Sequence, residues 1–275
     1  VERSRGLGDV YKRQIYCSTM LNVIHQFETS TVLFFVTVCF VAGFIKGIVG
    51  FAMPMIILGC SAALGMPLLG LAVLIMPTLV TNIYQVSLFG KAELVKSIRD
   101  FRFFLFACLI GLFVGANLFA AANLNILIAG IGAVVLLLSL LQLVNIRAPK
   151  RTNSRALSSI SGAITGLLGG GTGIWGPTTV LYLTSIGTSK KRQILVQGLT
   201  FALSSFFLLF AHLYTGVFNK DTGILSTFMV LPAMIGMIFG VGIQRYLNQD
   251  KFRVATLILL CIGGVYLIYR SANVF

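Results

Sequence analysis

Acidic residues are scarce in this sequence, and none of them lies within an apolar stretch. The chain has 7 Asp and Glu residues against 21 Lys and Arg residues. Carboxylates inside a membrane are common parts of proton and cation pathways. The acids of this chain all fall in tails or loops: Glu2, Asp9, Glu28, Glu93, Asp100, Asp221 and Asp250. The sequence therefore offers no carboxylate within an apolar stretch that could carry a proton or a sodium ion.

The motifs of several enzyme and metal-site classes are missing as well. The sequence contains no HExxH, no GxSG and no pair of intramembrane aspartates, so we expect no enzyme. Its five cysteines form no CxxC motif and have no histidine nearby at ligand spacing. We therefore predict no metal, no cofactor and no disulfide.

What the chain has in abundance is apolar sequence. Hydrophobic residues make up 57% and charged residues 10%, with a mean hydropathy of +0.96. Several runs reach the ~20 residues that span a bilayer. We predict an all-α, multi-pass membrane protein surrounded by lipid. The net charge of +14 comes from basic residues in short loops, as in cytoplasmic loops, so nucleic acid is not expected as a partner.

The apolar stretches divide the chain into two similar halves. A tail at 1–30 comes first, and its residues 1–14, VERSRGLGDVYKRQ, resemble translated cloning sequence and are left out of the topology. A first transmembrane repeat at 31–146, a basic cytoplasmic loop at 147–155 and a second repeat at 156–275 follow. The stretches lie at about 31–64, 67–89, 101–122, 124–146, 156–187, 193–218, 222–244 and 254–270.

Two of these stretches are too long for one simple span, and both are interrupted by glycine and proline. The first contains Gly43, Gly47, Gly50 and Pro54, and the fifth contains Gly162, Gly166, Gly169 and Pro177. We pair these glycines in order along the two stretches. In both stretches the first two glycines are four residues apart and the next two are three apart, and the second stretch carries four extra residues in its glycine run. Because three ordinary spans follow each long stretch, we predict a repeat of four segments.

Basic loop residues decide how the two broken stretches meet the membrane. Single crossings would divide the loop Lys and Arg residues ten to six between the two sides. Re-entrant hairpins would divide them fourteen to two, with Lys220 and Arg270 alone on the outer side. The positive-inside rule favours the hairpins. The halves then become inverted repeats, with both broken helices near the midplane, as in many transporters.

The broken stretches carry a family resemblance. AGFIKGIVGFAMP in the first half and GLLGGGTGIWGP in the second, within two four-segment halves, resemble the TauE/SafE family of sulfite exporters over roughly residues 31–272. The resemblance implies export of sulfite, or of a related sulfur oxyanion or organosulfonate, across the bacterial inner membrane. It brings no list of site residues, so the site is predicted from this sequence.

Lys46 is the first candidate site residue. It is the only Lys or Arg well inside an apolar stretch, and a charge at that depth costs at least ~2.5–3.5 kcal/mol on insertion scales. Beside the break at Gly50 and Phe51 it could meet an anionic substrate. The alternative is that Lys46 extends from a helix end to the lipid headgroups.

The second candidate is the glycine run of the fifth stretch. Backbone N–H groups of an unwound segment could hold an anion there, with the side chains of Thr172 and Trp175 beside them. The backbone candidates are Gly169, Gly170, Gly171, Thr172 and Gly173. Gly171 to Gly176 also matches GxGxxG, but no soluble βαβ unit surrounds it. The alternative is close helix packing through small residues.

Polar residues in two other stretches complete the predicted site. They are Asn82 and Gln85 in the second stretch, and Gln197 and Ser205 in the sixth. The repeat places Asn82 opposite Ser205, so both would approach the pseudo-twofold axis. Hydrogen bonding between helices is the alternative for each of them.

The function that these features favour is secondary transport of a small anion held at the broken helices, with a sulfur oxyanion as the expected substrate. A transporter of another small carboxylate or anion is the nearest alternative. A non-transport membrane scaffold would explain the glycines but leaves Lys46 unexplained. Whether the protein is a homo-oligomer is left open by the sequence.

Overall fold

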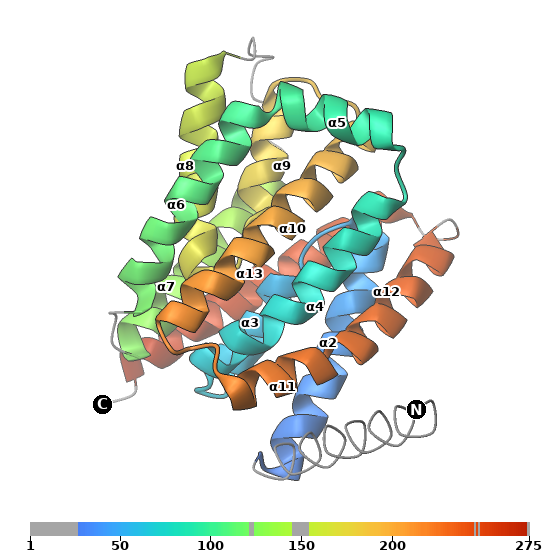
Figure 1. The fold of residues 1–275 in the computed structure, drawn as a ribbon. Helices are drawn as coiled ribbons and strands as arrows, with labels where there is room; N and C mark the ends of the chain where they lie inside the picture. Colours follow the sequence, from blue (N-terminus) through green and yellow to red (C-terminus); the bar gives the residue numbers. More distant parts are fainter. Residues whose placement is uncertain (1–26, 121–123, 145–153, 245, 247, 274–275) are drawn as a thin grey trace, which may run out of the picture.

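The structure, a computed structural model, describes residues 27–120, 124–144, 154–244, 246 and 248–273 (Figure 1). Within these residues the regular elements are all helices, because in lipid a helix satisfies its backbone hydrogen bonds within one segment. The first half contains α2 (Thr29–Val49), α3 (Met53–Ala63), α4 (Pro67–Ser87), α5 (Lys91–Asp100), α6 (Arg102–Ala120) and α7 (Leu124–Leu143). The second contains α8 (Arg155–Thr172), α9 (Gly176–Ser185), α10 (Lys190–Tyr214), α11 (Lys220–Phe228), α12 (Val230–Gln244) and α13 (Gln249–Asn273).

Each predicted apolar stretch corresponds to a helix or to a pair of helices. Four described segments are long and apolar enough to cross a bilayer: Thr29–Val49, Pro67–Ser87, Lys191–Tyr214 and Lys220–Ile243. A fifth candidate is the pair α5 and α6, which is bent by 72°. The sequence analysis treated the basic segment 91–100 as a loop. It is a helix that continues into α6 after the bend, and its predominantly polar sequence explains why no apolar stretch marked it.

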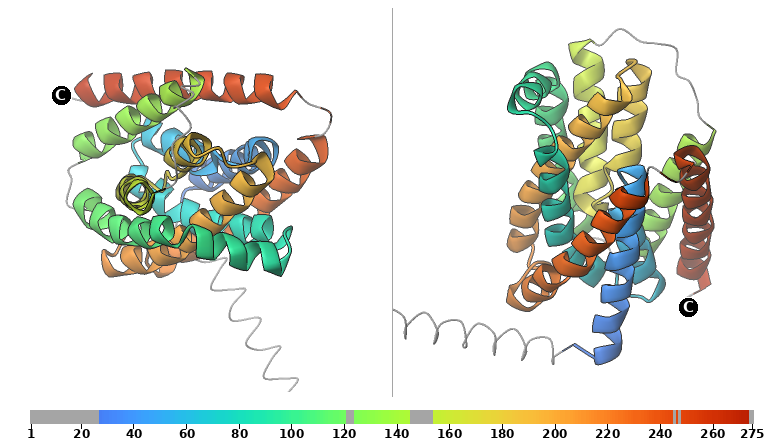
Figure 2. Two further views of the ribbon diagram at one scale, coloured as in Figure 1. Left: turned by 90° about the horizontal axis from the view of Figure 1, so that it is seen from above. Right: turned by 90° about the vertical axis from the view of Figure 1, so that its right-hand side faces the viewer.

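The helices form three layers (Figure 2). α7 and α13 pack together on one side, and α4, α6 and α10 form the opposite layer. Between them lie the two interrupted pairs, α2 with α3 and α8 with α9. The outer faces carry exposed apolar side chains, among them Phe106, Leu118, Phe210, Ile238 and Tyr269, as expected of a surface that meets lipid. The broken helices are therefore enclosed by protein on both sides.

The first break separates α2 from α3 at residues 50–52. Gly50 caps α2 with φ +83°, and Ala52 also has a positive φ, of 79°. Positive φ is uncommon for an alanine and costs of order 1–3 kcal/mol unless the surroundings hold it in place. Pro54 follows in the first turn of α3, where its missing N–H removes no helical bond.

The second break, between α8 and α9, has the same construction. Gly173 caps α8 with φ +67°, and its N–H donates to the carbonyl of Gly169 at 2.6 Å. Gly50 likewise donates to the carbonyl of Lys46 at 2.7 Å. Pro177 lies in the first turn of α9, as Pro54 does in α3. Each break thus consists of a left-handed glycine cap, two residues and a new helix with proline as its second residue.

After its break, α9 runs back alongside α8. Ser158, near the start of α8, and Tyr182, near the end of α9, are joined by a hydrogen bond of 2.8 Å. The ring of Tyr182 stacks on Phe104 near the start of α6, with 4.7 Å between ring centroids. The beginning of α10 lies at this same end, where Lys191 pairs with Glu93 of α5 at 3.2 Å. Figure 1 shows these helix ends together at the top of the molecule.

Glycines let the broken pairs approach their neighbours closely. A Cβ at Gly166 or Gly170 of α8 would overlap backbone atoms of α6, and one at Gly43 or Gly47 of α2 would overlap backbone atoms of α12. The partner atoms are the carbonyl oxygens of Cys108, Leu112, Ala233 and Met237 respectively. This is the small-residue packing of membrane helices. It accounts for most of the glycines in α8, which the sequence analysis assigned in part to a ligand site.

The breaks also correct the register in which the two halves were compared. The helix caps align Gly50 with Gly173, whereas the sequence analysis paired Gly50 with Gly169. In the corrected register Gly43, Gly47, Gly50 and Pro54 correspond to Gly166, Gly170, Gly173 and Pro177. The spacing of four, three and four is then shared by both stretches, and no extra residues are needed in the glycine run.

Candidate functional site

Lys46 lies in the last turn of α2 and is almost completely buried, with 2% of its surface exposed. Its ammonium donates to Oγ1 of Thr81 at 2.8 Å and to Oδ1 of Asn82 at 2.5 Å, both on α4. It therefore points across the interior and does not extend to the headgroups. Both partners are neutral, and no described carboxylate pairs with Lys46. Within the described residues, neutral protein dipoles therefore surround the Lys46 amine.

A proline inside α4, Pro77, interrupts the backbone hydrogen bonds of the helix about one turn before the residues that contact Lys46. Pro77 has no N–H to donate to the carbonyl of Val73, one turn earlier. The hydroxyl of Ser226, on α11, donates to that carbonyl at 2.9 Å and accepts from the N–H of Met76 at 3.2 Å. Thr81 in turn donates to the carbonyl of Pro77 at 2.6 Å, which leaves its oxygen lone pairs for Lys46.

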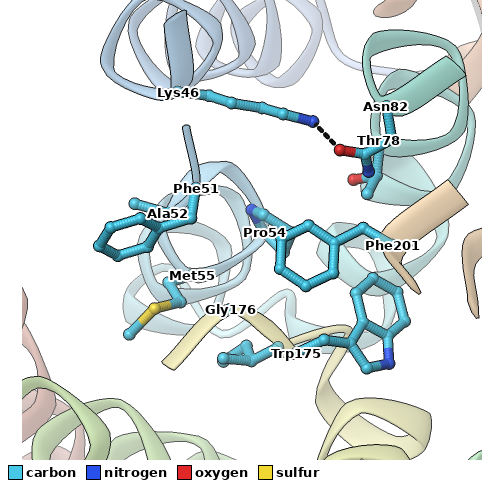
Figure 3. A pocket seen from close by; sticks show the side chains of 11 residues that line it. Lys46, Phe51, Ala52, Pro54, Met55, Thr78, Asn82, Trp175, Gly176 and Phe201 are labelled. Carbon is cyan, nitrogen blue, oxygen red and sulfur yellow. Dashed lines mark hydrogen bonds between the residues drawn. The ribbon is translucent and has the colours of Figure 1, made fainter. Parts of the chain in front are cut away.

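A small pocket lies between the ammonium of Lys46 and the second break (Figure 3). Its lining comes from both breaks and from α4 and α10: Lys46, Phe51, Ala52, Pro54, Met55, Thr78, Asn82, Ile174, Trp175, Gly176 and Phe201. The enclosed volume is about 10 Å³, about what one water molecule needs. A larger ligand would therefore require the walls to separate.

Three residues that line the pocket have a buried polar atom without a hydrogen-bond partner: Oγ1 of Thr78, Nδ2 of Asn82 and Nε1 of Trp175. Nε1 points away from the pocket, toward Gly169 of α8, so the unpartnered atoms on the Lys46 side are those of Thr78 and Asn82 (Figure 3). The orientation of the Asn82 amide follows from Lys46, which can only donate and so faces Oδ1. Nδ2 and Nε1 are both hydrogen-bond donors. Buried polar groups are normally satisfied, and unsatisfied ones clustered around one cavity indicate a ligand site.

The first turns of α3 and α9 also reach the pocket. Met55 and Gly176 line it, and helix geometry leaves their N–H groups without intrahelical acceptors. Helix N-termini carry partial positive charge. With Lys46 and the amide donor of Asn82, these helix ends make the pocket electropositive on several sides, an arrangement that suits an anion.

The pocket brings together four of the predicted site residues: Lys46, Phe51, Asn82 and Trp175. Gly50 does not line it but forms the turn that carries Phe51 and Ala52 to it. Sequence reasoning missed the other seven lining residues: Ala52, Pro54, Met55, Thr78, Ile174, Gly176 and Phe201. Thr78 lies one helical turn before Asn82, and this spacing could have indicated it. Phe201 has no polar signal in the sequence that would have distinguished it from core.

The predicted backbone site in the glycine run is not formed as expected. Residues Gly169 to Thr172 are the last turn of α8, and their N–H groups lie inside a helix. Gly173 uses its N–H to close that helix. The chain breaks only after Thr172, and the residues of this break that line the pocket are Ile174, Trp175 and Gly176. The hydroxyl of Thr172 donates to the carbonyl of Leu168 and accepts from the N–H of Ile174 at the break.

Three other predicted residues are buried but do not line the pocket. Gln85 donates to the carbonyl of Ile194 at 3.0 Å and so joins α4 to α10. Ser205 donates to the carbonyl of Phe201 within α10, at 2.6 Å. Gln197 is also buried on α10. Gln85 therefore forms a hydrogen bond between helices, which was the alternative to a role in the site, whereas Ser205 bonds within its own helix.

Comparison with known proteins agrees with this architecture. No curated protein and no solved structure matches the chain. The family model described as "Sulfite exporter TauE/SafE" matches residues 35–267, which include both breaks and every residue that lines the pocket. The chain therefore belongs to the TauE/SafE sulfite exporter family of membrane transport proteins.

Proposed function

We propose that this protein exports a small oxyanion, with sulfite as the expected substrate, across the bacterial inner membrane, and that the anion binds beside Lys46. The observation that carries the proposal is the set of groups around the pocket. A buried ammonium without a described counter-ion lies beside an unpartnered side-chain donor, Nδ2 of Asn82, and two helix N-termini. An anion would satisfy the donors and offset the charge.

Energetics favour a transported ligand over a fixed structural role for Lys46. An uncompensated buried charge destabilises a protein by about 3–5 kcal/mol, so a scaffold would gain by replacing the lysine with an apolar residue. In a transporter the same electrostatic cost becomes binding energy when the anion enters. Weak binding is sufficient, because the substrate must also leave.

The helix arrangement supports alternating access by two inverted repeats. The proposed repeats are α2–α7 and α8–α13. In each of them a broken pair packs through glycines against a helix of the other half: α2 against α12, and α8 against α6. The pocket lies between the two breaks, as expected for a site near a pseudo-twofold axis. Relative movement of the halves would open the walls around Phe51 and Phe201.

The test is flux into inside-out vesicles that contain the purified protein. Radiolabelled sulfite should accumulate when the lumen is made positive, because the potential supplies about 2.3 kcal/mol per charge per 100 mV. Lys46→Met should lose this flux. Lys91→Met, at an exposed position on α5, is the matched control and should retain it. Sulfite flux that is unchanged in folded Lys46→Met protein would contradict the assigned anion contact.

The same vesicles separate sulfite from the alternative substrates. Unlabelled methanesulfonate and acetate should compete poorly if the compact pocket favours an inorganic oxyanion. Strong competition by either would move the assignment to an organic sulfonate or carboxylate. Absence of flux for sulfite, and for labelled methanesulfonate and acetate in the same assay, would favour the non-transport scaffold.

A further inference from the structure

The charge count of the pocket indicates which ionic form of the substrate it accepts. Sulfite in water exists as the dianion and as singly charged hydrogen sulfite, and the two interconvert near neutral pH. The pocket contains one cation, Lys46, and its other lining residues are uncharged. A dianion would leave one negative charge without a partner in a region of low dielectric constant, where an unpaired charge is disfavoured. A monoanion would match the ammonium.

The hydrogen-bonding groups lead to the same conclusion. Nδ2 of Asn82 can only donate, which suits an unprotonated oxygen of the ligand. The hydroxyl of Thr78 is also unpartnered, and unlike the amide nitrogen it can accept a hydrogen bond. A monoprotonated oxyanion has one proton to donate. The two unpartnered groups thus provide one donor and one acceptor for a ligand of this type.

No second titratable group in the pocket would adjust its charge to a dianion. The helices that line it or pack on them carry other ionisable side chains, but of the described ones only Lys46 lines the pocket. The other described ones are Cys39 on α2; Cys60 on α3; Tyr84 on α4; Lys91, Glu93, Lys96, Arg99 and Asp100 on α5; Arg102 and Cys108 on α6; Arg155 on α8; Tyr182 on α9; Lys191, Arg192, His212 and Tyr214 on α10; Lys220 and Asp221 on α11; and Lys251, Cys261, Tyr266 and Tyr269 on α13.

We infer that the pocket binds the singly charged, protonated form of its oxyanion, so that each hydrogen sulfite ion carries one proton out with it. This inference rests on the proposed function and specifies its substrate. It would also let a chain with no carboxylate in its apolar stretches couple transport to pH, because the proton travels on the substrate. The protein moves one net negative charge per cycle and needs no residue that carries a proton.

The test is equilibrium binding of radiolabelled sulfite to the purified, detergent-solubilised protein across the pH range in which hydrogen sulfite gives way to the dianion. The apparent affinity for total sulfite should fall about tenfold per pH unit above that ionisation. Expressed per hydrogen sulfite ion, it should stay constant. The emission of Trp175, the single tryptophan of the chain, is a second readout at the pocket itself.

Chlorate provides the control for titration of the protein. It has the pyramidal shape of sulfite but a single charge at every pH tested, so its affinity, measured by competition, should not change. An affinity for total sulfite that is constant or rises with pH would overturn the inference, because the dianion would then be bound. A parallel fall for chlorate would also overturn it, because a protein group would be titrating. Failure of every anion to bind at any pH would instead remove the proposed site itself.

Discussion

The indole ring of Trp175 occupies the space in which a side chain at residue 169 would begin. A Cβ built at Gly169 would overlap Nε1 and Cδ1 of the ring. In the register defined by the two helix caps, the counterpart of Gly169 is Lys46, and the counterpart of Trp175 is Ala52. One half therefore directs a long cationic side chain at the pocket from a helix end. In the other half the corresponding residue, Gly169, has no side chain, and the ring of Trp175 fills the space.

Gly169→Ala should displace Trp175 and weaken anion binding. Overpacking of this kind costs typically 1–3 kcal/mol, and the ring cannot move without opening the pocket wall. We expect a shift of the tryptophan emission maximum and an at least tenfold weaker affinity for sulfite. Gly59→Ala on α3, where a Cβ would meet no atom within 4 Å, is the control. An unchanged emission spectrum and an unchanged affinity would show that the indole position does not matter.

Two glycines on α12 should respond in opposite ways to the same substitution. A Cβ at Gly240 would overlap the backbone carbonyl of Phe44, whereas one at Gly242 would meet nothing within 4 Å. Gly240→Ala should lower the unfolding temperature in detergent by several degrees, because α12 must move away from α2. Gly242→Ala should be neutral or stabilising by up to about 1 kcal/mol, since alanine is the better helix former. Equal effects at the two positions would count against the close packing of these helices.

Ser226→Ala should destabilise the protein through the helix interruption at Pro77. The substitution leaves the carbonyl of Val73 without its donor, at an expected cost of about 1–2 kcal/mol in the free energy of unfolding. Pro77→Ala restores an N–H that can donate to Val73 within α4. The cost of Ser226→Ala should then shrink in the Pro77→Ala background, which a double-mutant cycle measures. Equal costs in both backgrounds would mean that Ser226 does not act by compensating for the proline.

A cysteine at residue 189 tests the hairpin formed by α8 and α9. Ser189 caps the start of α10, beside the ion pair of Lys191 with Glu93. In the proposed topology Ser189→Cys should react with a membrane-impermeant thiol reagent from the cytoplasmic side. Asn219→Cys, at the start of α11, should react from the opposite side. Periplasmic reaction at residue 189 would make α8 and α9 a single crossing and remove the inverted symmetry.

Much of the fold could be predicted from the sequence, because lipid imposes a simple rule on it. Backbone polar groups must be satisfied within each apolar segment, so apolar runs become helices, and glycine with proline marks the breaks. The order of the segments and the interruption after Gly50 followed from these signals. The helix 91–100 did not, because its sequence is mostly polar and carries no membrane signal.

The candidate site could be predicted only in part, for a physical reason. Lys46 was identifiable because a lysine in an apolar run is costly anywhere. The glycine run gave an ambiguous signal, since the same residues serve close packing and unwound backbone. Packing of α8 on α6 explains Gly166 and Gly170, and the break falls at Gly173. Neither outcome can be read from composition, because both depend on which helix lies alongside.

The sequence by itself determined an all-helical membrane protein with two interrupted segments and one intramembrane charge. These properties follow from hydropathy, from backbone restriction at glycine and proline, and from the scarcity of acids. Tertiary structure decided which groups surround that charge. Thr81 and Asn82 of α4 meet Lys46, and Trp175 arrives from the other half of the chain. These contacts join residues distant in sequence, and they depend on helix packing that local sequence patterns do not specify.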